Sequence, residues 1–279
     1  MLDAKQIKKD FPILTEGVHY LDSAATTQKP QAVLDAVMNY YKSANANPHR
    51  SAHKFGQAAT ESYENARATV AKFLNAKSER EIVFTKNATE SLNILSNYFM
   101  RTLKEGDEIL ITIAEHHANF VNWQEVAKAT GAKLVIGYLN DKRELDADEF
   151  LSKVNAKTKV VSFQEASNVT GYITDTKKLI KEIRNKSDAT IIVDGSQSVP
   201  HKKTDVVDMD CDFLAFSGHK MLAPMGIGVL YGKEEKLNEL SPLLYGGDMI
   251  EYVYETHATY LDAPARFEAG TQNVGAAVG

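Results

Sequence analysis

Cysteine is almost absent from this sequence, which has one, Cys211, among 279 residues. A single cysteine excludes an intrachain disulfide framework and a cysteine-based zinc cluster within the chain. Long apolar runs are missing too: none approaches the roughly 18 residues of a membrane helix, and the first residues contain no apolar signal-peptide core. The net charge of −5 gives no reason to expect nucleic acid as a partner. These absences predict a cytoplasmic protein without nucleic-acid or membrane partners.

Common ligand-binding motifs are also absent. The chain contains no P-loop, and Gly226-Ile227-Gly228 is not followed by the helix that a dinucleotide-binding motif would open. His49 and His53 have the spacing of a metal-binding pair, but no HExxH glutamate lies between them. Pro48 also argues against a helix at this point. We therefore expect no metal site.

The main pattern in the chain is an alternation of short apolar runs with segments of helical length. The strand-like runs lie at 82–85, 108–113, 133–139, 159–163, 190–193, 211–216 and 228–231, and helical segments lie at 88–104, 118–130, 146–154 and 175–186. This alternation predicts an α/β fold with a mainly parallel seven-stranded sheet and helices on both faces. The last run follows its predecessor too closely for a helical crossover, so we expect it to be antiparallel, at or near an edge.

The first third of the chain shows a different pattern. A helix is expected from Pro30, a loop over 45–56 and a long helix over 57–75, while the pattern loosens after Gly232. We divide the chain into an N-terminal segment, 1–30, and one large domain, 31–279.

Polar side chains follow two of the apolar runs. Asp194 ends one of them, and Ser217, His219 and Lys220 follow another. Ligands of such sheets sit outside the carboxyl ends of the strands, so an acid and a lysine there can face one ligand. Pyridoxal phosphate needs both, a lysine for a Schiff base and a carboxylate beside its pyridinium nitrogen. Taken singly, Asp194 is compatible with a turn and Lys220 with the surface. Their joint placement favours the cofactor.

The turn before the helix 88–104 suits a phosphate group. Backbone N–H groups at a helix start bind anions, and the Thr89 hydroxyl adds a donor. Asn87 and Glu90 also fit a capping box, and the two interpretations are compatible.

Three further residues follow strands and suit the same ligand. The flat ring of His116 can stack on a cofactor or cap the next helix. Asn168 and Gln197 can bind a ring hydroxyl or a carboxylate, or can belong to ordinary turns. Each alternative stays open on the residues alone.

The chain resembles the class V aminotransferase group of fold-type I pyridoxal phosphate enzymes, and most of all the SufS-type (group II) cysteine desulfurases, also known as selenocysteine lyases. The matching motifs span nearly the whole chain: YLDSAATTQKP (20–30), HRSAH (49–53), NATESLN (87–93), EHHAN (115–119), SNVTG (167–171), VDGSQSV (193–199), DCDFLAFSGHK (210–220), GGDMI (246–250) and RFEAGTQN (266–273). Smaller departures from the family pattern are Glu165, Asp248 and Gln272, none of which removes a cofactor contact.

The resemblance implies roles for individual residues. Lys220 would carry the cofactor, Asp194 would pair with its pyridinium nitrogen, and His116 would stack on its ring and take part in catalysis. Asn168 and Gln197 would address the ring hydroxyl and the substrate. The phosphate would be held by Ala88, Thr89, Ser217 and His219, and by Thr271 from the partner subunit of a homodimer.

The resemblance also implies a reaction, in which L-cysteine becomes L-alanine and its sulfur passes to an enzyme cysteine for iron–sulfur cluster assembly, with a SufU/SufE-type acceptor. The family's persulfide cysteine and substrate-carboxylate arginine lie in a C-terminal small domain that we expect to be largely absent here. Cys211, between two aspartates, is expected to be structural. Two alternatives stay open: another class V enzyme, such as a selenocysteine lyase or an aminotransferase-like enzyme, and a non-catalytic, truncated cofactor-binding subunit.

Overall fold

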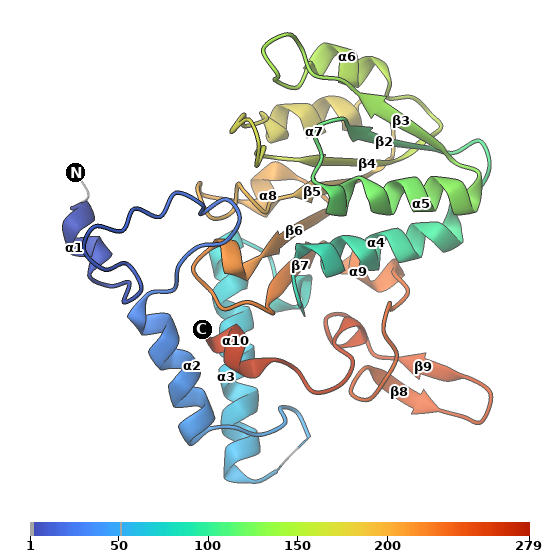
Figure 1. The fold of residues 1–279 in the computed structure, drawn as a ribbon. Helices are drawn as coiled ribbons and strands as arrows, with labels where there is room; N and C mark the ends of the chain where they lie inside the picture. Colours follow the sequence, from blue (N-terminus) through green and yellow to red (C-terminus); the bar gives the residue numbers. More distant parts are fainter. Residues whose placement is uncertain (1–2, 51) are drawn as a thin grey trace.

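The computed structural model describes residues 3–50 and 52–279. Its centre is a seven-stranded sheet of order β1-β7-β6-β5-β4-β2-β3, with helices against both faces (Figure 1). The strands are β1 (Ile82–Thr85), β2 (Glu108–Thr112), β3 (Lys133–Gly137), β4 (Thr158–Gln164), β5 (Thr190–Asp194), β6 (Phe213–Ser217) and β7 (Gly228–Gly232). Only the pairings of β7, with β6 and with β1, are antiparallel. The predicted fold class is confirmed, as is the antiparallel course of β7, which lies next to the edge strand β1.

Two apolar cores separate the sheet from its helices. One face is covered by α4 (Ala88–Thr102), α5 (Val121–Thr130) and α9 (Glu234–Glu239), and the other by α3 (Lys54–Leu74), α6 (Ala147–Ser152), α7 (Thr176–Arg184) and α8 (Val206–Met209). Successive strand residues alternate between the cores: Leu214 and Phe216 of β6 enter one, Phe213 and Ala215 the other. Burial on both faces explains why the strands are apolar throughout.

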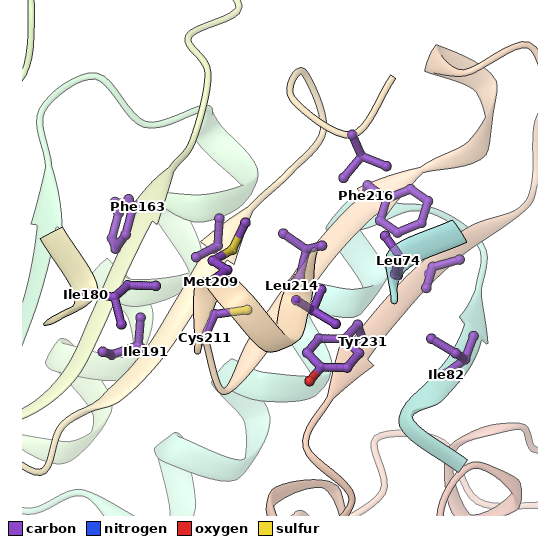
Figure 2. Close-up of a cluster of buried hydrophobic side chains, with 14 of the residues drawn as sticks. Leu74, Ile82, Phe163, Ile180, Ile191, Met209, Cys211, Leu214, Phe216 and Tyr231 are labelled. Carbon is purple, nitrogen blue, oxygen red and sulfur yellow. The ribbon is translucent and has the colours of Figure 1, made fainter. Parts of the chain in front are cut away.

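Cys211 belongs to the core on the α3 side. Figure 2 shows it between Met209 and Ile191, close to the sheet. Its side chain is fully buried, and this burial, together with the charge of Asp212, raises the pKa of the thiol above its usual range. A thiol in this state is a poor nucleophile. The structural role expected for Cys211 fits this environment.

The remaining elements lie outside the central sheet. They are α1 (Ala4–Lys8), α2 (Gln31–Ser43), α10 (Val274–Val278), the hairpin of β8 (Ile250–Val253) and β9 (Ala258–Tyr260), and the 3-10 turns η1 (Glu79–Glu81), η2 (His117–Asn119), η3 (Gly218–Lys220) and η4 (Ala265–Phe267). In Figure 1 the hairpin extends away from the sheet, whereas α10 packs against α2 and α3. The sequence pattern did not predict the hairpin or α10. No helix among residues 3–50 and 52–279 is long and apolar enough to cross a membrane.

Two helices start three residues away from their predicted starts, and a histidine that caps a helix or a 3-10 turn lies near each start. α3 begins at Lys54 rather than at 57, since His53 Nδ1 accepts a hydrogen bond from Gly56 N at 3.2 Å. The helix expected over 118–130 is divided into η2 and α5, because His116 caps the 3-10 turn first. Histidine is not among the preferred N-cap residues, so sequence rules miss such starts.

Gly228 brings the sheet against the first turn of α4. A Cβ atom at this position would lie 2.5 Å from the Cα atom of Asn87, so the close approach requires glycine. Gly228 pairs with Thr85 of β1 and with Ser217 of β6. The end of β6 therefore lies beside the helix start where the sequence predicts a phosphate.

Candidate active site

A cavity of about 500 Å³ opens at the carboxyl ends of the parallel strands. Its wall comes from six stretches of the chain: Asp22, Ala24, Ala25, Asn87, Ala88, Thr89, His116, Ala118, Gln164, Ala166, Asn168, Asp194, Ser196, Gln197, Ser217, His219 and Lys220. Nine of the ten predicted site residues are in this set. The tenth, Thr271, lines a separate hollow beside Lys86 and Glu90.

Lys220 lies in η3, directly after β6, and reaches the cavity from there. Burial lowers the pKa of its amine, and the nearby charge of Asp194 partly opposes this effect. Among the described residues the amine has no hydrogen-bond or ion-pair partner within its reach. A partly desolvated and unpaired amine is available as a nucleophile and as a base.

Asp194 ends β5 and is 3% exposed. Its Oδ1 accepts a hydrogen bond from Ser196 N at 2.9 Å, whereas no group of the described chain donates to its Oδ2. Asp194 lines the cavity and its Oδ2 is open to it, so this geometry suits a ligand that brings a donor or a positive charge. A protonated pyridine nitrogen is such a group.

The start of α4 forms another part of the wall. Asn87 Oδ1 accepts from Glu90 N at 3.0 Å and Glu90 Oε2 accepts from Lys86 N at 2.6 Å, a variant of the expected capping box. Ala88 N donates to Ser217 Oγ at 2.8 Å, which joins two of the predicted phosphate ligands. Thr89 faces the cavity, and within the described residues neither its N–H group nor its hydroxyl has a partner. The capping and the phosphate interpretations are both compatible with this geometry.

His116 caps η2 and also lines the cavity, so its capping role leaves the proposed stacking on a cofactor possible. Its Nδ1 accepts from Ala118 N at 3.1 Å, which assigns the proton of the neutral ring to Nε2. Partial desolvation at the cavity wall and the charge of Lys220 lower the pKa of His116. The neighbouring His117 does not line the cavity.

Behind His116 lies a buried carboxyl group that the sequence did not reveal. Glu115 accepts hydrogen bonds from Thr112 Oγ1 at 2.5 Å, Asn119 Nδ2 at 2.6 Å and Gln164 N at 3.1 Å. Burial raises the pKa of Glu115 to about 8, although these donors oppose the shift. The raised pKa favours the protonated form of Glu115. In that form Thr112 Oγ1 would accept from Glu115 instead of donating to it, because the Asn119 and Gln164 groups only donate.

The N-terminal segment forms the remaining wall, a part that sequence reasoning also missed. The carbonyl oxygen of His219 accepts from Thr27 N at 3.0 Å and from Lys29 Nζ at 3.0 Å. Gln197 Nε2 donates to the carbonyl oxygen of Ala24 at 2.7 Å. The small residues of the YLDSAATT motif were a signal that the backbone comes close here.

The histidines of the suspected metal pair have other partners. His49 Nε2 lies 2.9 Å from Glu64 Oε1, and His53 caps α3. In the part of the chain that the structure describes, no three His, Cys, Asp or Glu side chains are grouped to hold a metal ion.

Residues 19–279 match the family described as aminotransferase class-V. A cysteine desulfurase from Synechococcus elongatus is 46% identical over 283 residues, which cover 99% of this chain but 45% of that protein. A probable cysteine desulfurase from Halalkalibacterium halodurans is 44% identical over 284 residues, 100% of this chain and 70% of the relative. The crystal structure of a cysteine desulfurase from Escherichia coli superposes with a TM-score of 0.91 at 41% identity, over 100% of this chain and 70% of that one. One from Thermococcus onnurineus gives 0.94 at 39% identity, over 100% and 69%.

The rest of each relative has no counterpart in these 279 residues. Enzymes of this family use pyridoxal 5′-phosphate. The cavity fits that group, because within residues 3–50 and 52–279 it offers a carboxylate oxygen and an amine without partners and a helix start with free donors. The chain therefore belongs to the class-V aminotransferase family, within its cysteine desulfurase group.

Proposed function

We propose that this chain is the cofactor-binding large domain, 31–279, of a SufS-type cysteine desulfurase, preceded by an N-terminal segment, 1–30. The observation that carries the proposal is that Lys220 and Asp194 line one cavity, each with a polar atom that has no partner in the part of the chain that the structure describes. The bound cofactor would supply an electron sink for the amino acid's Cα carbanion.

The roles of the wall residues follow from their charges. Asp194 Oδ2 would hold the proton on the cofactor's ring nitrogen. Lys220 would bind the cofactor covalently and, once released by the substrate amine, would accept the Cα proton at Nζ. Its lowered pKa suits this task, because more of the amine is free of a proton near neutral pH.

The other predicted residues would orient the ligand. Thr89, Ala88, Ser217 and His219 would hold the phosphate at the start of α4, and the ring of His116 would stack on the cofactor. Asn168 and Gln197 would address its hydroxyl group and the substrate. Thr271 lies outside the cavity, which is compatible with service to a partner subunit in a homodimer.

The sulfur-transfer step needs a thiol that this chain does not offer. An enzyme thiolate would attack the substrate sulfur and break its bond to Cβ, and L-alanine and a persulfide would be the products. Cys211 is the one cysteine of the sequence, and it is buried with a raised pKa. We propose that the acceptor thiol lies outside these 279 residues, and that the sulfur then serves iron–sulfur cluster assembly through a SufU/SufE-type acceptor. The cytoplasmic location stays a prediction.

Titration with pyridoxal phosphate tests the cofactor site. The wild-type chain should gain a visible absorbance band, and borohydride should fix the cofactor to Lys220, as peptide mass spectrometry would show. Lys220→Ala should lose the covalent adduct. Lys128→Ala, which removes an exposed lysine on α5, should keep it. A wild-type chain that stays colourless with excess cofactor would overturn the proposal.

A further inference from the structure

Two buried residues, Glu115 and Asn119, hold the loop that carries His116. His116 itself is exposed, whereas Glu115 and Asn119 on either side of it are 7% and 0% exposed. Asn119 Nδ2 donates to Glu115 Oε2 at 2.6 Å, and Asn119 N donates to the carbonyl oxygen of His116 at 2.8 Å. The loop is therefore anchored by its two buried residues.

Gln164, the last residue of β4, forms two hydrogen bonds with this loop. Gln164 N donates to Glu115 Oε1 at 3.1 Å, and Gln164 Nε2 donates to the carbonyl oxygen of Ala114 at 2.7 Å. Gln164 is also the β4 residue opposite Asp194 of β5. Glu115 thus links the loop of His116 to the strand that lies beside Asp194.

The surroundings of Glu115 require an acceptor at this position. Asn119 Oδ1 already accepts from Trp123 Nε1 at 3.0 Å and from Ser162 Oγ at 2.6 Å, so its amide N–H group points to Glu115. Gln164 N is also a donor, and only the Thr112 hydroxyl can reverse its role. A glutamine in place of Glu115 could accept from Asn119 and donate to Thr112. Its NH₂ group would then face Gln164 N–H, so the hydrogen bond between the residue 115 side chain and Gln164 N would be lost, whereas Gln164 Nε2 could still donate to Ala114.

We propose that Glu115 is a positioning residue of this site, whose carboxyl group ties the end of β2 to the end of β4 and so fixes the imidazole of His116 at the cavity. The consequence for the cofactor rests on the proposed function. The coupling of Glu115 to His116 does not rest on the proposed function, because it concerns only side chains of this chain.

The coupling can be measured in the cofactor-free chain. Long-range ¹⁵N NMR of His116 should report one neutral tautomer, with the proton on Nε2, in the wild type. Glu115→Gln should give a mixture of tautomers. Asp212→Asn is the matched control, because Asp212 is 3% exposed and accepts from Ile191 N at 2.8 Å. It lies at the amino end of β6, at the end of the strands opposite to the cavity. This control variant should leave the tautomer unchanged. An unchanged tautomer in Glu115→Gln, or an equal change in the control, would overturn the proposal.

A double-mutant cycle tests whether Glu115 acts on the cofactor through His116. Glu115→Gln and His116→Ala should each weaken pyridoxal phosphate binding about tenfold, and the double variant should also bind about tenfold more weakly. A hundredfold loss in the double variant would mean independent action and would contradict the proposal. If Glu115→Gln does not fold, Glu115→Asp, which keeps an acceptor but shortens it, gives the same test. A wild type that binds no cofactor would defeat the proposed function, while the tautomer measurement would still decide the role of Glu115.

Discussion

At the amino end of β6, the carboxylate of Asp212 is fully paired. At the carboxyl end of β5, the equally buried Asp194 has one oxygen to which no residue of 3–50 or 52–279 donates. Asp212 Oδ1 lies 2.7 Å from Arg184 Nη2 and 3.3 Å from Lys233 Nζ, and its Oδ2 accepts from Ile191 N. The two aspartates flank neighbouring strands and have the same exposed fraction, 3%. The difference shows that burial alone does not mark a functional acid. An unpaired polar atom that faces a cavity is the better mark.

Removal of the Lys220 amine should have the largest effect of the changes that we predict, and it can be measured as a slower exchange of a substrate Cα hydrogen. The wild-type chain loaded with pyridoxal phosphate should exchange the Cα hydrogen of L-alanine for deuterium in heavy water, a step that needs no sulfur acceptor. Lys220→Ala should slow this exchange by about 10³-fold, because it removes the base that accepts the Cα proton. Proton NMR of the alanine, corrected for free cofactor, measures the rate.

Lys128→Ala serves as the control for this exchange and should keep the wild-type rate, since its side chain is exposed on α5. A Lys220→Ala rate within tenfold of the wild type would mean that another group is the base.

Asp212→Ala should lower the free energy of unfolding more than Asp194→Ala. Asp212→Ala leaves the Ile191 N–H group without its acceptor and removes one carboxylate from Arg184 and Lys233, which keep their contacts with Asp210. We therefore expect a loss of about 2 kcal/mol in the free energy of unfolding. Asp194→Ala removes one hydrogen bond from the cofactor-free chain and should cost less than about 1 kcal/mol. Urea denaturation measures both. Equal losses would show that the two edges do not differ as we infer.

The sequence was sufficient to predict the residues whose position depends on a single strand and on where that strand ends. Asp194 and Lys220 follow apolar runs directly, so their place at the carboxyl edge is a consequence of strand direction. Glu115 was missed although it stands beside His116, because its partners come from three segments. Thr112, Asn119 and Gln164 meet only when β2 and β4 pair.

Other features depend on contacts that no local pattern records. Asp22, Ala24 and Ala25 reach the cavity because the carbonyl group of His219 holds the segment that follows them. The hairpin of β8 and β9 is mostly exposed, so its strands lack the continuous apolar pattern of the central sheet. Thr271 was assigned from resemblance alone, and it lies outside the cavity, beside Lys86 and Glu90.

Glu115 should make the stability of the chain depend on pH. Its pKa is about 8 in the folded chain, above its ordinary value of 4.5. The folded state thus binds more protons, and the contribution of Glu115, complete below 4.5, is lost as the pH rises through 8. The wild type should therefore lose stability relative to Glu115→Gln by at most about 1.4 kcal/mol per pH unit in this window. Urea denaturation over this range measures the difference. Parallel curves for the two proteins would show that Glu115 is ionised in both states.

The smallest effect concerns the charge that Lys220 imposes on His116. Burial is the first cause of the lowered pKa of His116, and the Lys220 ammonium is the second. Lys220→Met keeps most of the side-chain volume but removes the charge, so the pKa of His116 in the cofactor-free chain should rise towards its ordinary value without reaching it. NMR titration of the imidazole measures this, with Lys128→Ala as the control that should leave it unchanged. If the pKa of His116 stays the same in Lys220→Met, the two side chains do not share one cavity in solution. The contrast between Asp194 and Asp212 would then lose its functional meaning. An amine too far away to change the pKa of His116 would also be too far away to bind a ligand stacked on that ring.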